Sequence, residues 1–297
     1  MPLKKEKALL IVNPKAGKQS AKAHIFEIIN ELSAKYTLTV HITEGPGDAV
    51  ETAKEAGDFD AVICCGGDGT LSQTVQGVMQ LEKKPVIGYL PCGTANDVAS
   101  TLRLPKNFKE GARQILGAEP QPHDIGLFNG KPFVYVASFG TFSKTSYETP
   151  QDVKNVFGEF AYLFTGISEL GNICGEDVTV IHDGVEDKFE NVTLLSVNNT
   201  ASIGGIVKLP KEQYQLDDGR FEMLIVKKPK NLSELQNTFF SVTKGEFDGK
   251  NAVLLHFRSA EIRIAHAVDW SIDGEAGGSA DTVSIGVVPK SIEILHQ

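Results

Sequence analysis

The sequence predicts an α/β domain with a doubly wound, mostly parallel sheet, followed by a β-rich antiparallel sandwich domain. In the first third of the chain, short apolar runs alternate with stretches of helical periodicity, which is typical of a parallel sheet. From about residue 126 onward, strand follows strand with turn residues between them. We therefore place the first domain at residues 1–125, with the last strand at 290–297 as a candidate to complete it, and the second domain at residues 126–289.

The first domain is expected to contain four strands with helices between them. The strands are expected at residues 8–12, 36–42, 61–65 and 86–90, and the helices at residues 21–32, 48–56 and 71–79. Ligands of such sheets bind beyond the carboxyl ends of the strands. The turns that follow residues 12, 65 and 90 are therefore the first candidates for a site.

The second domain is expected to consist mainly of strands. These are expected at residues 133–137, 192–197, 221–226, 252–257 and 261–264, with helices at 157–170 and 233–241. The aromatic-rich stretch 139–164 has two interpretations, a contact with the surface of a membrane and a helix packed in the core. The core is favoured because apolar helical faces usually point inward.

Composition excludes several classes of protein. The chain has 297 residues, a formal net charge of −9 and no long block of Lys and Arg, which disfavours binding to nucleic acid. No apolar stretch approaches the length of a membrane span, and the N-terminus lacks a secretory signal, so we expect a cytoplasmic protein. The cysteines have neither metal-ligand nor disulfide spacing and are expected to be free thiols: Cys64, Cys65, Cys92 and Cys174.

The most informative motif is Gly66-Gly67-Asp68-Gly69-Thr70, which connects a predicted buried strand to a predicted helix. Its glycines leave backbone N–H groups able to face an anion, and the helix N-terminus adds a partial positive charge. A single carboxylate here would repel phosphate unless it acted through a metal ion or a proton. The motif therefore indicates phosphoryl transfer.

Two further turns in the first domain allow a structural and a functional interpretation. The turn at residues 13–18 is either a plain strand-to-helix turn or a phosphate site with Lys15 and Lys18 at its mouth. In the turn at residues 91–97, Thr94 is expected to be a helix N-cap, with Asp97 completing the cap three positions later. That interpretation explains Gly93 less well.

Two acidic turns in the second domain are equally open. Residues 215–220 contain two adjacent carboxylates before a glycine, which suit either a hairpin turn or a Mg²⁺ site. Residues 269–275 follow a strand and form either a solvated turn or the location of a general base, Glu275.

Taken in order, these five motifs resemble those of the diacylglycerol kinase catalytic family, which comprises soluble bacterial lipid kinases related to sphingosine kinases. The resemblance covers nearly the whole chain. It implies a kinase that transfers the γ-phosphate of ATP, with Mg²⁺, to a lipid hydroxyl, most often that of diacylglycerol, to give phosphatidic acid. It also implies that ATP lies in the cleft between the two domains.

The resemblance also implies roles for individual residues. The expected ATP-binding residues are Asn13, Pro14, Lys15, Ala16, Gly17, Thr43, Gly66, Gly67, Asp68, Gly69, Thr70, Leu71, Ser72, Gln73, Thr94, Asn96 and Asp97. The expected catalytic residues are Asp68 and the general base Glu275. A magnesium ion that orders the second domain would be held by the Asp218 side chain and the backbone oxygens of Gln215 and Arg220.

Three residues depart from the common pattern of that family. Ala16 stands where many members have Ser, and Ser72 and Gln73 stand where many have Asn and Glu. Because of these departures, a catalytically silent regulator that binds a nucleotide or a lipid is an alternative function. An NAD kinase is a second alternative, because NAD kinases share the GGDGT motif. As a lipid kinase, the protein would contact the inner face of the membrane peripherally. Relatives are often dimers, so a homodimer is compatible with the resemblance.

Overall fold

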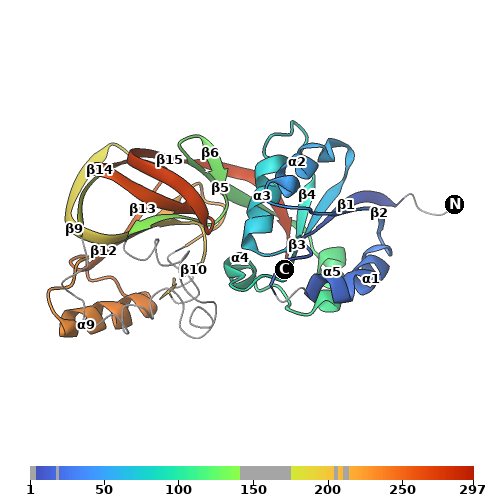
Figure 1. Cartoon of the computed structure of the whole chain (residues 1–297), viewed down its shortest axis with the longest axis horizontal. Helices are drawn as coiled ribbons and strands as arrows, with labels where there is room; N and C mark the ends of the chain where they lie inside the picture. Colours follow the sequence, from blue (N-terminus) through green and yellow to red (C-terminus); the bar gives the residue numbers. More distant parts are fainter. Residues whose placement is uncertain (1–4, 18–19, 141–174, 204–206, 210–213) are drawn as a thin grey trace. The chain divides into compact units, whose positions relative to one another are not determined.

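The computed structural model describes residues 5–17, 20–140, 175–203, 207–209 and 214–297. The chain divides into two compact units, unit 1 with residues 1–123 and 290–297, and unit 2 with residues 124–289. The chain therefore leaves unit 1 once, between residues 123 and 124, and returns to it once, between residues 289 and 290 (Figure 1).

Unit 1 is built on a parallel sheet. Its strands are β1 (Glu6–Val12), β2 (Tyr36–Ile42), β3 (Ala61–Gly66) and β4 (Val86–Pro91), in the order β2-β1-β3-β4. The C-terminal end of the last strand, β15 (Glu275–Leu295), is parallel to β4 and pairs through Ile294 and Ile87. Strands β1 and β3 are buried along most of their length, which explains why their sequences are almost continuously apolar.

The pairing register brings the carboxyl ends of these strands to one edge of the sheet. Val12 at the end of β1 lies opposite Ile42 of β2 and Cys65 of β3, and Gly66 lies opposite Pro91 of β4. The turns that follow the four strands therefore begin side by side. This edge is the one at which open α/β sheets bind their ligands.

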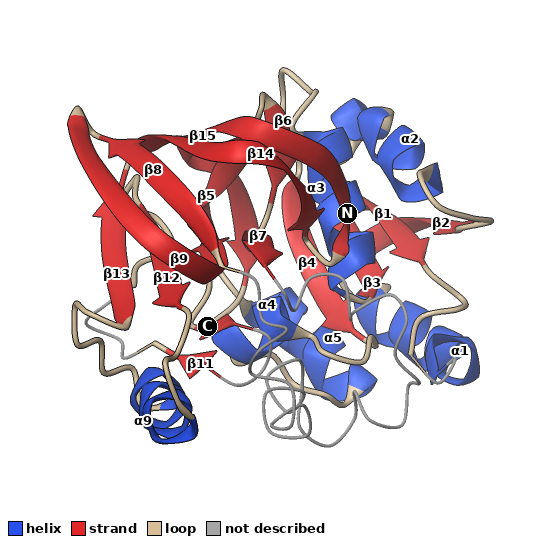
Figure 2. Cartoon of the chain, turned by 60° about the vertical axis from the view of Figure 1, so that its left-hand side comes forward, coloured by secondary structure: helices blue, strands red, loops and turns tan. Residues whose placement is uncertain are grey.

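Helices lie on two sides of this sheet (Figures 1 and 2). Helices α2 (Asp48–Lys54) and α3 (Asp68–Val78) pack together, and α1 (Ser20–Leu32) packs with α5 (Phe108–Gly117). Two short elements, η1 (Ala56–Asp58) and α4 (Asp97–Thr101), complete the helices described in unit 1. The helix predicted over 48–56 therefore ends early, at Lys54, and a turn of 3₁₀ helix follows it.

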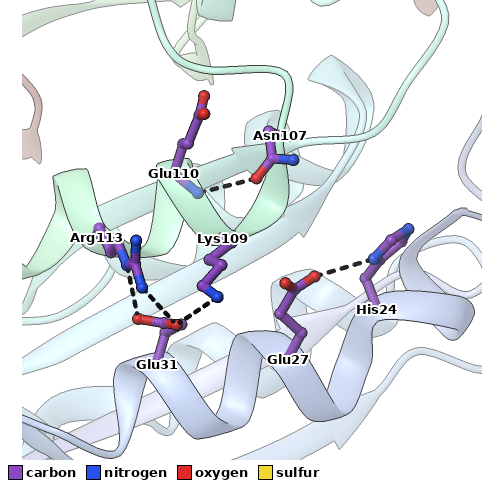
Figure 3. Close-up of polar contacts among 7 residues, drawn as sticks. All are labelled: His24, Glu27, Glu31, Asn107, Lys109, Glu110 and Arg113. Atoms are coloured by element: carbon purple, nitrogen blue, oxygen red, sulfur yellow. Dashed lines mark hydrogen bonds and ion pairs between the residues drawn. The ribbon is translucent and has the colours of Figure 1, made fainter.

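Helices α1 and α5 are held together by an ion-pair cluster (Figure 3). Glu31 accepts hydrogen bonds from the guanidinium of Arg113 at 3.0 and 3.3 Å, and Lys109 lies 3.7 Å away. The bond from Arg113 is the main reason that the pKa of Glu31 is lowered. Asn107 caps α5 by accepting the Glu110 N–H at 3.1 Å. Because the Lys109 and Arg113 side chains are largely exposed, these ion pairs contribute little to the free energy of unfolding.

Unit 2 is mainly antiparallel. Its elements are β5 (Pro120–Phe128), β6 (Lys131–Phe133), β7 (Val136–Gly140), β8 (Glu176–His182), β9 (Val185–Asn198), β10 (Ser202–Ile203), β11 (Val207–Lys208), β12 (Phe221–Lys227), α9 (Leu232–Thr243), β13 (Ala252–Phe257), β14 (Ser259–Ile272) and most of β15. Strands β9 and β14 each pair with β8 along one part and with β7 along another. The sheet consequently folds around an apolar core that contains Phe139, Phe221 and Trp270, and a second, smaller cluster contains Leu224 and Val242 of α9.

The predictions for unit 2 meet three different outcomes. The helix predicted over 233–241 is confirmed as α9. The strand predicted over 133–137 is wrong, since β6 ends at Phe133 and β7 begins at Val136. The helix predicted over 157–170 and most of the aromatic stretch 139–164 lie outside the described residues. In the part of the chain that is described, no helix is long and apolar enough to span a membrane.

Candidate active site

The turns after β1, β2, β3 and β4 are joined by backbone hydrogen bonds at the point where each strand ends. The Asn13 N–H donates to the Cys65 carbonyl at 2.9 Å, and the Cys92 N–H donates to the Gly66 carbonyl at 2.8 Å. The Thr43 N–H donates to the carbonyl of Val12 at 2.9 Å. The turns that carry the first-domain residues expected at the ATP site therefore start next to each other, at strand ends connected by backbone hydrogen bonds.

Asp68 joins two of these turns through its side chain. Its Oδ2 accepts the Asp97 N–H at 3.0 Å, and its Oδ1 accepts the Val98 N–H at 3.3 Å. The hydroxyl of Tyr89 also donates to Oδ1, at 3.4 Å. Asp68 is only 8% exposed, so its charge is compensated by these donors and by the N-terminal end of α4. Asp68 thus fixes the turn of residues 92–96 against the GGDGT turn.

This arrangement corrects the expectation that Thr94 is a helix N-cap. Helix α4 begins at Asp97, and the residue before it, Asn96, has a left-handed conformation with φ of 53° and no side-chain capping bond. Thr94 is exposed on the turn. The cap comes instead from Asp68 of another turn, which a search of adjacent residues could not find.

Asn96 shapes the same turn locally. Its Oδ1 accepts the Gly93 N–H at 2.9 Å, and its Nδ2 donates to the Gly93 carbonyl at 2.8 Å. This pair of bonds closes a small ring that only an amide side chain can form in both directions. Asn96 therefore positions the backbone that carries Thr94.

The glycines of these turns allow the backbones to approach closely. A Cβ atom on Gly93 would lie 2.6 Å from the Cα of Gly67, and a Cβ on Gly66 would lie 2.5 Å from the Cβ of Thr70. Close packing therefore favours glycine at positions 66, 67 and 93. Gly17, with φ of +52°, packs in the same way against the Cys92 carbonyl.

Asn13 connects the first turn to the GGDGT helix. Its Nδ2 donates to the Thr70 hydroxyl at 2.9 Å, and its Oδ1 accepts the Lys15 N–H at 2.9 Å. Lys15 is exposed, and Ala16 is buried against the core. The departure at Ala16 is thereby explained structurally, because this position packs inside unit 1. Lys18 lies outside the described residues.

The departures at Ser72 and Gln73 also have local contacts. Gln73 accepts the Gly47 N–H through Oε1 at 3.1 Å, and Ser72, which is buried, accepts a bond from Gln76 at 3.1 Å. Gln73 therefore holds the turn of residues 43–48, which Asp48 also braces by accepting the Glu44 N–H at 2.7 Å. That bond is the largest cause of the lowered pKa of Asp48. Leu71 is fully buried and serves the core of α3.

The N-cap position of α3, the helix that begins at Asp68, is Gly67, which has no side chain to cap the helix. The partial positive charge of the helix N-terminus lies at the same edge as the exposed side chains of Lys15 and Thr94. These features fit the phosphates of a nucleotide, which favour helix N-termini and cationic neighbours.

The three described cysteines are free and buried, as predicted. Burial raises the pKa of Cys64 to about 12. Cys65 and Cys92 are in contact, and the hydrogen bond between them raises the pKa of Cys65 and lowers that of Cys92. Cys65 and Cys92 pack in the core of unit 1 where β3 and β4 end, whereas Cys174 lies outside the described residues.

Glu275 is exposed and is the first residue of β15. It follows a two-residue turn, Asp273-Gly274, that connects it to Ile272 of β14. Asp273 is 3% exposed and accepts three backbone N–H groups, from Val134, Tyr135 and Val136. The alternative of a solvated acidic turn is therefore wrong for Asp273, although Glu275 itself faces solvent.

The residues expected to hold magnesium lie on the turn before β12. Asp218 is exposed, and its Oδ1 accepts the Arg220 N–H at 2.9 Å. The turn is braced by Asp124, which accepts the Gly219 N–H at 2.6 Å. In the described chain, no three His, Cys, Asp or Glu side chains converge as a metal site. A site of one carboxylate and two carbonyl oxygens still suits Mg²⁺, which retains several waters.

Glu222, next to this turn, was not predicted. It is 1% exposed, its Oε2 has no hydrogen-bond partner, and the Nε2 of His256 lies 3.9 Å from its Oε1. Burial, followed by the charge of Asp218, raises its pKa to about 9. Its position as the second residue of a buried strand gave no signal that could be read from the sequence.

Comparison with known proteins identifies the family of this chain. Residues 7–128 match the diacylglycerol kinase catalytic domain, and residues 137–296 match the YegS C-terminal NAD kinase beta sandwich-like domain. A diacylglycerol kinase of Bacillus subtilis (strain 168) is 31% identical over 278 residues, which cover 92% of this chain and 91% of that protein. The chain belongs to the diacylglycerol kinase family.

Other members of the family are equally similar. The diacylglycerol kinase of Staphylococcus aureus (strain bovine RF122 / ET3-1) is 32% identical over 280 residues, 92% of this chain and 87% of that protein. A solved diacylglycerol kinase structure from Bacillus anthracis str. Sterne matches with a TM-score of 0.78 and 25% identity, over 98% of this chain and 97% of that one. The resemblance read from the five motifs is thereby confirmed at the level of the family.

Within this member of the diacylglycerol kinase family, the predicted residues fall into two groups. Those of unit 1 are brought together at one sheet edge by the bonds described above. Those of unit 2 lie on two separate turns, one with Gln215, Asp218 and Arg220 and the other with Glu275. Sequence reasoning missed Tyr89 and the clamping role of Asp273, because their partners are distant in the chain.

Proposed function

We infer that this chain is an ATP-dependent lipid kinase that transfers the γ-phosphate of ATP to the hydroxyl of diacylglycerol, giving phosphatidic acid. The observation that carries this inference is the edge of joined turns built around Asp68, in a chain of the diacylglycerol kinase family. The edge combines a helix N-terminus with glycine at its N-cap position, glycine-lined backbone and an exposed Lys15.

We assign ATP binding to unit 1 and the lipid substrate to unit 2. The residues proposed to bind ATP are those of the four turns, from Asn13 to Asp97. The strand order β2-β1-β3-β4, with helix pairs on two sides, supports a doubly wound sheet as the frame of this site. Asp68 acts here mainly as a positioning residue, since backbone amides and Tyr89 engage both of its oxygens.

Glu275 is the proposed general base. Its exposed carboxylate would accept the proton of the lipid hydroxyl while that oxygen attacks the γ-phosphorus and the bond to the β-phosphate oxygen breaks. Mg²⁺ supplies charge neutralisation for the triphosphate when it is bound. Lys15 adds positive charge beside the first turn.

Replacing Glu275 with Gln tests the assigned base. We expect kcat to fall by about 10²–10⁴-fold, because the amide cannot take up the proton, while ATP affinity stays unchanged. Steady-state kinetics with diacylglycerol in mixed micelles and calorimetric titration of ATP measure the two quantities. Near-normal turnover by Glu275→Gln would exclude the role.

The reaction itself is tested with radiolabelled ATP. Labelled phosphatidic acid is expected from diacylglycerol micelles, with no labelled product from NAD. The reverse result would favour an NAD kinase, a reading that the family match supports less. ATP binding without ADP release on a panel of extracted membrane lipids would indicate a silent regulator. The same panel identifies which lipid alcohol is preferred.

We further propose that Mg²⁺ binds the turn of residues 215–220 and orders unit 2. The Asp218 carboxylate and the Gln215 and Arg220 carbonyl oxygens would hold it, on a turn that the Asp124 carboxylate braces by accepting the Gly219 N–H. Thermal unfolding with and without Mg²⁺ measures this, and an equal response in Asp218→Asn would exclude the site.

A kinase of a membrane lipid must reach its substrate at a bilayer surface. We therefore propose a cytoplasmic protein that binds the inner face of the membrane peripherally. Co-sedimentation with vesicles that contain diacylglycerol tests this contact, and sizing by light scattering tests whether the protein is a homodimer. Absence of vesicle binding in the presence of ATP and Mg²⁺ would contradict the membrane contact.

A further inference from the structure

The turn before Glu275 has the geometry of a tight hairpin with two left-handed residues. Asp273 has φ of +49° and Gly274 has φ of +81°, and the flanking residues Ile272 and Glu275 are paired. Positive φ at both central residues is the signature of a type I′ turn, which Asp-Gly favours. The turn therefore determines where β15 begins and where the Glu275 side chain leaves the backbone.

The Asp273 carboxylate ties this turn to a second segment. Oδ2 accepts the Val134 N–H at 2.8 Å, and Oδ1 accepts the N–H groups of Tyr135 and Val136 at 3.0 and 3.1 Å. In return, the Asp273 N–H donates to the Val136 carbonyl at 2.8 Å. Three successive amides that face one carboxylate form a strong, buried, charge-assisted contact.

In two other turns of unit 2, the side chain of the first turn residue also accepts backbone N–H groups, but fewer of them. Asn129, before Gly130, accepts one backbone N–H, that of Ser284, at 2.8 Å. Asp183, before Gly184, accepts those of Arg258 and Ser259 at 3.0 and 3.2 Å. In both turns the backbone N–H also donates to the opposite strand.

The comparison of the three turns isolates what is special about Asp273. Asp273 accepts hydrogen bonds from more backbone N–H groups than Asn129 or Asp183 does. It is also only 3% exposed, whereas Asp183 is exposed. The single side-chain oxygen of Asn can accept one backbone N–H, but accepting three N–H groups with two oxygens requires a carboxylate. Among these turns, only the one at Asp273 precedes the residue that we propose as the base.

We propose that Asp273 is a positioning residue for Glu275. By fixing the turn to residues 134–136, it holds the start of β15 in the place from which Glu275 reaches the lipid hydroxyl. This inference rests on the proposed function. Asp273 touches no reacting atom, since its oxygens are occupied by backbone amides, so it acts only through the residue that follows the turn.

The test is a double-mutant cycle of Asp273→Asn and Glu275→Gln. Asn keeps the left-handed conformation but turns an NH₂ group toward a backbone N–H. We expect Asp273→Asn to lower kcat by about 10–10²-fold, since a displacement of about 1 Å at a catalytic group has this scale. The KM for ATP should change less than about twofold. In the Glu275→Gln background, adding Asp273→Asn should lower kcat no further.

The matched control is Asp183→Asn, which weakens the same kind of turn away from Glu275. It should leave kcat unchanged and lower amide protection only at residues 258–259. Hydrogen exchange at residues 134–136 shows directly whether Asp273→Asn has lost the hydrogen bonds from these backbone N–H groups. A melting temperature above the assay temperature shows that the variant is folded, and Asp273→Glu serves as the second variant if Asp273→Asn is not.

The possible results separate the two proposals. If wild-type protein phosphorylates no lipid, the proposed function fails. If it does, and Glu275→Gln is slow, the positioning role is overturned by normal kcat in Asp273→Asn with released amides. It is also overturned by a further loss of kcat in the double variant, which would show that Asp273 acts independently of Glu275.

Discussion

The two units hold their candidate site residues in different ways. In unit 1, side chains of one turn bond to the backbone or side chain of another, as with Asp68 and the start of α4 and with Asn13 and Thr70. In unit 2, the turn that carries Glu275 bonds to one neighbouring segment, and the turn of residues 215–220 bonds to Asp124. In unit 1 the site turns therefore form a network, in which each turn is hydrogen-bonded to another site turn. In unit 2 each site turn is braced separately, by residues outside the site.

Sheet topology explains the contrast. Parallel strands end at one edge, so turns that are far apart in the sequence begin next to each other and can share side chains. Antiparallel hairpins return the chain to its neighbour, so an Asp-Gly turn is complete within a few residues and needs only one outside partner. A change in the network should therefore affect several turns at once, whereas a change in a braced turn should act locally.

The largest test of this contrast is Asp68→Ala. It leaves the buried Asp97 and Val98 amides without their acceptor, which costs about 1–3 kcal/mol of unfolding free energy for each unpaired donor. Because the turn of residues 92–96 is no longer fixed, ATP affinity should fall by about tenfold or more. Denaturant unfolding and calorimetric ATP titration measure both losses.

Two controls accompany that variant. Asp273→Ala should lower stability but leave ATP affinity intact, because its amides belong to unit 2. Asp60→Ala removes an acceptor of the Lys7 N–H at the opposite, amino-terminal edge of the sheet and should also leave ATP affinity intact. If Asp68→Ala bound ATP as tightly as wild type, the network description of unit 1 would be wrong.

Much of unit 1 could be predicted from sequence because its signals are local. Apolar runs mark β1, β3 and β4, and the turn residues that follow them mark the sheet edge. The family was recognised from five ordered motifs and is confirmed by matches over both parts of the chain. The assignments of individual ATP, metal and catalytic residues remain predictions.

The errors arose where a partner lies far along the chain. Thr94 looked like an N-cap because it precedes α4, but Asp68, which lies 29 residues before Asp97, supplies the cap. The strand over 133–137 looked continuous, but the amides of Val134 and Tyr135 are used by Asp273, 139 and 138 residues later. Long-range side-chain acceptors override local patterns and leave no periodic signal.

A smaller effect is expected from close backbone packing in the network. In Gly93→Ala, the new Cβ would lie 2.6 Å from the Cα of Gly67, so one turn must move. We expect a loss of about 1–3 kcal/mol in unfolding free energy and a several-fold weaker ATP affinity. Gly45→Ala is the control, because its Cβ would meet nothing within 4 Å, and it should change stability by less than about 0.5 kcal/mol. Equal behaviour of the two variants in unfolding and ATP titrations would contradict the packing role of Gly93.

The smallest expected effect comes from the single bond between Asn13 and Thr70. Removing it with Thr70→Val should cost about 0.5–1.5 kcal/mol of unfolding free energy and raise the KM for ATP modestly, and Asn13→Ala should cost more because it also removes the acceptor of the Lys15 N–H. In a network, the two changes should not add, because each removes the same bond between the first turn and α3. A double-mutant cycle by denaturant unfolding measures the coupling. Fully additive losses would mean that the turns after β1 and β3 are braced separately, like those of unit 2, and that the contrast between the units does not extend to this pair.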